Sequence, residues 1–183
     1  MKTLTNLFVL LFFAITVNLS AQEDTDYSIY PGFADFGNLS ALEDGEMVTE
    51  ILIEEKLLRM VSKFTKDDPE LSDLIGGLKL IKVNTFEVTP NNEDKLMDRA
   101  KMIDKDLMKK NWDRIVKTKS RGEVANVYIK TDGDEEFVGI TVVAIDEGGE
   151  AAFVNVVGSI NMETLGKLGQ KFDIPGLDDI KEE

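Results

Sequence analysis

The sequence contains no cysteine and no histidine. Their absence excludes the Ser-His-Asp and Cys-His nucleophile systems, as well as zinc, copper and haem sites built on nitrogen or sulfur ligands. Because disulfides are also excluded, stability must come from a packed core. The chemistry that remains uses carboxylates, hydroxyls and amines, and we expect no catalytic residues, no bound metal and no cofactor.

Basic residues are also scarce: 21 Lys and Arg stand against 35 Asp and Glu, for a net charge of -14. The electrostatic field of this negative charge repels nucleic acid, whose binding needs clustered Lys and Arg. We therefore expect no nucleic-acid partner. Hydrophobic residues make up 43% of the 183 positions, which indicates one ordinary folded domain rather than a disordered tail.

Long apolar runs are missing except near the start. Lys2 precedes the run Leu7 to Val17, and small and polar residues follow up to Gln22, the layout of a signal peptide. A transmembrane anchor is the alternative, but the apolar stretch of 11 residues is shorter than the roughly 20 that span a bilayer. We therefore predict that residues 1–21 are a signal peptide cleaved near Ala21, leaving a periplasmic or secreted chain with no stable membrane anchor.

The next segment, residues 22–45, interleaves four aromatics with turn-forming residues and has no helical or strand period. We predict an extended segment and leave two roles open. Its aromatics either cover the domain's own core or form an exposed strip that binds a partner. The residues of this candidate interaction surface are Tyr27, Tyr30, Phe33 and Phe36.

Residues 46–172 carry the periodic patterns of an α+β domain, and residues 173–183 form an acidic tail. Met47 to Ile53 fits a strand or a helix by period alone, and we place a strand there, with a helix from Glu54 onward. The clearest helix has Asn91 as its expected N-cap. Its apolar stripe comprises Leu96, Ala100, Ile103 and Leu107. The other predicted elements are a short helix ended by Gly76 and Gly77, a strand at Leu80 to Val88, and a closing helix from Asn161.

Four β-branched runs separated by hairpin-turn compositions predict a four-stranded meander in the last third of the chain. The runs are Arg114 to Lys119, Val124 to Thr131, Phe137 to Ile145 and Ala151 to Gly158. The last two are apolar on both faces, so we expect helices on one face of the sheet and the N-terminal segment or a partner subunit on the other. The acidic cluster Asp132 to Glu136 does not match an EF-hand loop and is typical of a solvated hairpin turn.

Several segments, taken in order, resemble the uncharacterised bacterial family known as domain of unknown function 4252. The segments are Pro31 to Gly37, Leu57 to Val61, Asp68 to Leu71, Gly77 to Val83, Asn111 to Val116 and Phe153 to Ile160. The resemblance covers about residues 31 to 170. It implies an exported α+β domain without an established activity, and it favours the strand reading of Met47 to Ile53.

The predicted fold is therefore α+β: an antiparallel sheet of about six strands ends in the four-stranded meander and packs against helices, one of which crosses between the second and third strands. We expect an exported, non-enzymatic binding or interaction module of the cell envelope. The alternatives are a carboxylate-dependent hydrolase and a periplasmic regulatory or sensor partner. Expected partners are an envelope protein, a small ligand or a second copy of the chain.

Overall fold

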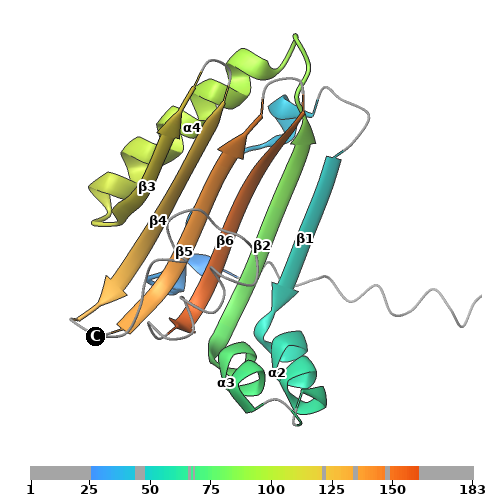
Figure 1. The fold of residues 1–183 in the computed structure, drawn as a ribbon, viewed down its shortest axis with the longest axis vertical. Coiled ribbons are helices and arrows are strands. Elements are labelled where there is room, and N and C mark those ends of the chain that lie inside the picture. The colour runs from blue at the N-terminus through green and yellow to red at the C-terminus, as the bar shows by residue number, and fades with distance from the viewer. Residues whose placement is uncertain are drawn as a thin grey trace, which may run out of the picture.

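The structure is a computed structural model that describes residues 26–43, 48–65, 67, 69–120, 123–133, 136–146 and 149–160. Within them, six antiparallel strands form one sheet in the order β1-β2-β6-β5-β4-β3 (Figure 1). The strands are β1 (Val48–Glu54), β2 (Leu78–Glu87), β3 (Asp113–Lys119), β4 (Val124–Asp132), β5 (Glu136–Ile145) and β6 (Glu150–Ile160). The helices are α2 (Glu55–Phe64), α3 (Pro69–Gly77) and α4 (Glu93–Lys109), with short 3-10 turns at Tyr27–Ile29 and Ser40–Leu42.

This architecture confirms the predicted α+β class, the meander β3-β4-β5-β6 and the helix that crosses between the second and third strands. β6 pairs with β2 and so joins the meander to the N-terminal strands, from Leu78 opposite Gly158 to Glu87 opposite Glu150. The sheet consequently has β1 at one edge and β3 at the other.

Helix α4 lies along the β3–β4 half of the sheet (Figure 1). Its buried residues are Leu96, Ala100, Ile103 and Leu107, the stripe that the helical period predicts. The predicted N-cap is off by one position: Asn92 is the cap, and its side chain does not cap the helix but donates from Nδ2 to the carbonyls of Leu42 and Glu87. No described helix is long and apolar enough to cross a membrane.

A Schellman turn ends α4 and directs the side chain of Trp112 into the core. Asn111 adopts the left-handed conformation at φ 57°, and the Trp112 N–H donates to the Leu107 carbonyl at 3.1 Å. Lys130 adds two bonds, from Nζ to the carbonyls of Lys110 and Asn111. Trp112, the single tryptophan of the chain, is thereby buried between α4 and the sheet.

The N-terminal segment packs on the same face of the sheet as α4. Ala34, Phe36 and Leu42 belong to one core cluster with the α4 stripe, and the Phe36 and Phe153 ring centroids lie 5.9 Å apart. The expectation that the helices share one face, with this segment or a partner subunit on the other, is therefore wrong: the segment lies on the face of α4, while α2 and α3 contact the opposite face. Helix α4 covers the β3–β4 half of this face (Figure 1). The extended segment covers the neighbouring half, which is formed by β5 and β6.

Asn155, fully buried on β6, fixes the backbone of that segment. Its Oδ1 accepts the Ala34 N–H at 3.0 Å, and its Nδ2 donates to the Gly32 carbonyl at 3.0 Å. The same Nδ2 lies 3.1 Å from the Ile140 carbonyl and 3.2 Å from Thr141 Oγ1 on β5. One amide therefore joins two sheet strands to an otherwise irregular segment.

The other face of the sheet carries a second apolar cluster. Leu58 of α2 and Ile75 of α3 join it at one end, where both helices lie beside the ends of β1 and β2 (Figure 1). The buried members of this cluster are Leu58, Leu78, Val127, Ile140 and Ile160. The predicted signal peptide, closing helix and acidic tail lie outside the described residues.

Candidate functional site

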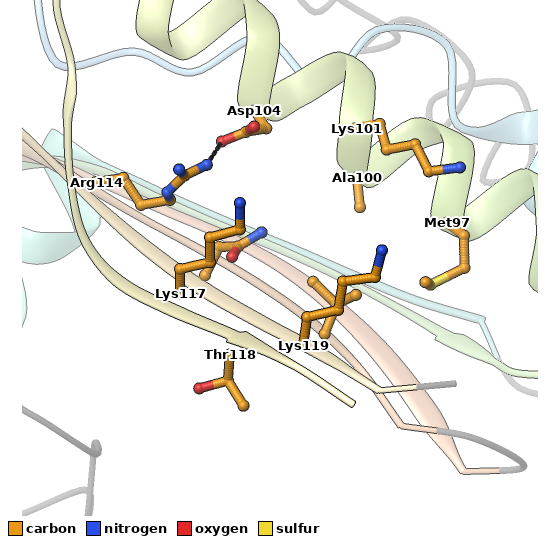
Figure 2. Close-up of a pocket in the computed structure, with 10 residues that line it drawn as sticks. Met97, Ala100, Lys101, Asp104, Arg114, Lys117, Thr118 and Lys119 are labelled. Carbon is orange, nitrogen blue, oxygen red and sulfur yellow. Dashed lines mark hydrogen bonds and ion pairs between the residues drawn. The ribbon is translucent and has the colours of Figure 1, made fainter. Parts of the chain in front are cut away.

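A cavity of about 130 Å³ lies between α4 and the β3 edge of the sheet. Lys117 and Lys119 of β3 extend toward α4, whereas Thr118 points the opposite way (Figure 2). The lining residues are Met97, Ala100, Lys101 and Asp104 from α4, Arg114, Lys117, Thr118 and Lys119 from β3, and Val124 and Asn126 from β4. Four cations and one carboxylate thus surround a small space in a strongly acidic protein.

A β-bulge brings three of these cations to one side of β3. Arg114 faces Tyr128 on β4, while Lys117 faces Asn126, and the register shifts by one residue between Arg114 and Val116. Strand residues 114 and 117 would lie on opposite faces without this extra residue, because side chains alternate along a regular strand. The bulge therefore adds Arg114 to the face that already carries Lys117 and Lys119.

Among the described residues, Asp104 is the only carboxylate in the lining, and its oxygen already accepts hydrogen bonds. Its Oδ1 accepts from the Tyr128 hydroxyl at 2.7 Å and from Arg114 Nη1. The hydrogen bond to Asp104 raises the pKa of Arg114, and burial, followed by the bond to Asp104, raises the pKa of Tyr128 far above its ordinary value. Both shifts keep Arg114 charged and the Tyr128 hydroxyl protonated, which suits an anchor between helix and sheet better than proton transfer.

Asn126 supplies the polar floor of the cavity. This residue is only 7% exposed, and its side-chain Oδ1 has no hydrogen-bond partner. A buried amide oxygen without a partner costs free energy, and this cost arises beside the cavity. Lys101 on the opposite wall pairs with Asp98 at 2.8 Å, whereas no ion pair is found for Lys117 or Lys119 among the described residues.

The predicted interaction residues lie away from this cavity, in the N-terminal segment. Phe36 is 2% exposed and is a core residue, so its ring is not displayed to a partner. Tyr27, Tyr30 and Phe33 are half-buried, with the Tyr27 and Phe33 rings 6.0 Å apart. Any recognition by this segment would depend on those three side chains, and that role stays a prediction.

Sequence patterns did not identify the cavity. Alternation along β3 places Lys117 and Lys119 on one face of the strand. Whether that face contacts α4 depends on the geometry of the turn between α4 and β3, which the sequence pattern does not give. The position of the bulge has no clear signal in the sequence. Within the part of the chain that the structure describes, no three acidic side chains converge on a point where they could hold a metal ion.

The acidic cluster Asp132 to Glu136 was predicted to form a hairpin turn, and its described residues confirm this. Asp132 ends β4, Gly133 follows at φ 72°, and Glu136 begins β5. Asp132 faces Glu136 in the register of these strands. The cluster is therefore a turn at the sheet's end, distant in the fold from the cavity at the β3 edge.

Comparison with curated proteins and with solved structures gives no match. A family model described as Domain of unknown function (DUF4252) matches residues 42–168. The matched region includes all six strands and the helices α2, α3 and α4, and therefore also every residue that lines the cavity. The chain belongs to the family of domain of unknown function 4252.

Proposed function

We propose that this chain is an exported, non-enzymatic binding module of the bacterial cell envelope, and that the α4–β3 cavity binds a compact anionic group. The observation that carries the proposal is the convergence of Lys101, Arg114, Lys117 and Lys119 around one buried, unpartnered amide. In a chain with a net charge of -14, a cavity lined by four cationic side chains and one carboxylate is a local reversal of sign that would attract an anion.

The size of the cavity limits the ligand. About 130 Å³ is well below the roughly 300 to 1,000 Å³ of pockets that enclose drug-sized molecules. It suits a single phosphate or carboxylate group, either free or at the end of a larger molecule.

Binding rather than catalysis is supported by what the lining offers. Asp104 is engaged by Arg114 and Tyr128, and Thr118 points away from the cavity (Figure 2). A hydrolytic site would need a general base or a nucleophile within hydrogen-bond reach of the bound group. The lysines, by contrast, suit electrostatic attraction of an anion without any bond being broken.

Calorimetric titration with sodium phosphate, at constant ionic strength balanced with sodium chloride, tests the site. We expect saturable binding that weakens by about tenfold or more in the double variant Lys117→Glu/Lys119→Glu, because each charge-assisted hydrogen bond contributes about 1.5 to 3 kcal/mol. The double variant Lys56→Glu/Lys63→Glu on α2 is the matched control, since it changes the net charge equally at two exposed positions. Equal affinities in the two double variants would contradict the proposed site.

Export is tested by the intact mass of the protein recovered from bacterial envelope fractions. We expect a chain that begins at Gln22, because the apolar stretch Leu7 to Val17 is too short to anchor it. A product that still begins at Met1 would contradict the envelope assignment, and it would leave the phosphate titration unaffected.

A further inference from the structure

The two edges of the sheet differ in how they are protected. The β3 edge carries Arg114, Lys117 and Lys119 and a bulge, which are devices that prevent pairing with another chain. The β1 edge has no Lys, Arg or Pro between Val48 and Glu54. Six of its seven residues are exposed, and the described residues place no strand on its outer side.

Exposed apolar side chains gather at this same edge. Of the eleven exposed large hydrophobic residues in the described chain, seven lie between Val48 and Phe64. They are Val48, Ile51 and Leu52 on β1, and Leu57, Met60, Val61 and Phe64 on α2. The α2 residues follow helical i, i+3, i+4, i+7 spacing, so α2 turns an apolar stripe to solvent, with Phe64 85% exposed. Val48 and Leu52 lie on one face of β1 and Ile51 lies on the other, so exposed apolar side chains flank the unpaired edge on both faces. Exposed apolar side chains beside an unpaired strand edge mark an interface.

From these observations we infer that β1 pairs antiparallel with β1 of a second copy of this chain, joining the two sheets across a two-fold axis through Ile51. A symmetric pair of this kind has self-complementary contacts, as most homodimers do. The proposal is independent of the anion site, which lies at the opposite edge of the sheet.

The charges on β1 select the register. In an antiparallel pair, directly opposite residues lie on the same face of the sheet. Neighbouring residues of one strand lie on opposite faces, so residue i of one copy cannot lie opposite residue i+1 of the other. The two-fold axis must therefore pass between the two copies of a single residue. An axis through Glu50 would place two glutamates opposite each other, and an axis through Leu52 would place Glu50 opposite Glu54. Like charges directly opposite are destabilising, which disfavours both.

An axis through Ile51 avoids every such pair. Glu50 then faces Leu52 of the second copy, and Glu54 faces its Val48. On the other face, Ile51 meets Ile51, while Thr49 meets Ile53, which makes a ladder of β-branched side chains. The same register sets the first turn of α2 beside the second copy's Val48.

Sedimentation velocity of the chain from Gln22 tests the proposal. We expect a reversible dimer that Ile51→Lys weakens by about tenfold or more, because two ammonium groups would then face each other. Ile115→Lys on β3 is the matched control, since Ile115 is 41% exposed and Ile51 42% exposed, and it should leave the dimer unchanged. A wild-type chain that stays monomeric, or a dimer that Ile51→Lys does not weaken, would overturn the proposal.

Cysteine pairs test the register separately, because the natural chain has no cysteine. Ile51→Cys should oxidise rapidly to a disulfide-linked dimer, whereas Thr49→Cys should not, because Thr49 is four positions from its own copy in this register. Equal rates for the two variants would overturn the two-fold axis at Ile51. Circular dichroism of each variant verifies that the fold is retained.

Discussion

Gly32→Ala should destabilise the protein by about 2 to 4 kcal/mol and release the N-terminal segment from the sheet, since overpacking and a lost buried hydrogen bond add. A Cβ at this position would lie 1.8 Å from the Val138 carbonyl oxygen and 2.8 Å from Gly139 Cα, so the backbone must move. That movement breaks the bond between the Gly32 carbonyl and Asn155, and it withdraws Phe36 from the core.

Urea denaturation followed by the fluorescence of Trp112 measures this loss, since the indole lies next to Gly139 and the chain has no other tryptophan. Gly76→Ala in α3 is the matched control, because its Cβ would meet nothing within 4 Å. We expect that variant to be as stable as the parent or more stable by up to about 1 kcal/mol, the helix-propensity difference between Gly and Ala. Equal stabilities for the two variants would refute the close approach of Gly32 to β5.

Asn155→Ala should lower the free energy of unfolding by about 2 to 4 kcal/mol, because it leaves the Ala34 N–H and the Gly32 carbonyl without partners inside the protein. Hydrogen exchange should also accelerate at the backbone amide of Ala34, which Asn155 Oδ1 holds in the parent. Urea denaturation and exchange mass spectrometry of the same samples measure the two effects.

Asn84→Ala provides the comparison for this change. Asn84 is a buried asparagine on the neighbouring strand β2, and its Oδ1 has no partner. Its replacement should cost less than about 1 kcal/mol and leave exchange at Ala34 unchanged, because no hydrogen bond to Oδ1 is lost. A loss as large for Asn84→Ala as for Asn155→Ala would show that side-chain volume, and not the hydrogen-bond network, sets the cost.

Local sequence patterns predicted the elements of this fold well. The α4 stripe and the four strands of the meander follow from periodicity and turn composition. The strand at Val48–Glu54 fits a strand or a helix by period alone, and the family resemblance favoured the strand that the structure shows. The pairing of β2 with β6 could not be predicted in this way, because it joins residues about 70 positions apart that share no local signal. Similarly, nothing in the apolar pattern of the N-terminal segment indicates which face of the sheet it covers.

The cavity was harder to predict than the fold, for two physical reasons. Its cations come from two elements, and only the packing of α4 on β3 and β4 brings Lys101 near Lys117. A single bulge decides whether Arg114 shares their side of the strand, and the residues around Ile115 do not specify a bulge. Sequence reasoning therefore placed the candidate surface on the aromatic segment, of which Phe36 is part of the core.

The two proposals respond oppositely to salt. Anion binding at Lys117 and Lys119 should weaken as ionic strength rises, since added ions screen exposed charges. Association of two copies that each carry a large negative charge should strengthen, because the same screening reduces their repulsion. Salt therefore separates ligand binding from dimer formation in any measurement that reports both.

The most direct test of the anion site follows the side-chain amide resonances of Asn126 by NMR while sodium phosphate is added at constant ionic strength. Asn126 is buried in the floor of the cavity, so its amide reports occupancy of this site and not a general effect of salt on the surface. We predict a saturable shift of these resonances in the parent chain, with the same dissociation constant as the calorimetric titration, and its loss in Lys117→Glu/Lys119→Glu. Resonances that stay in place while phosphate binds, or that shift equally in the double variant, would contradict the assignment of the cavity as the binding site.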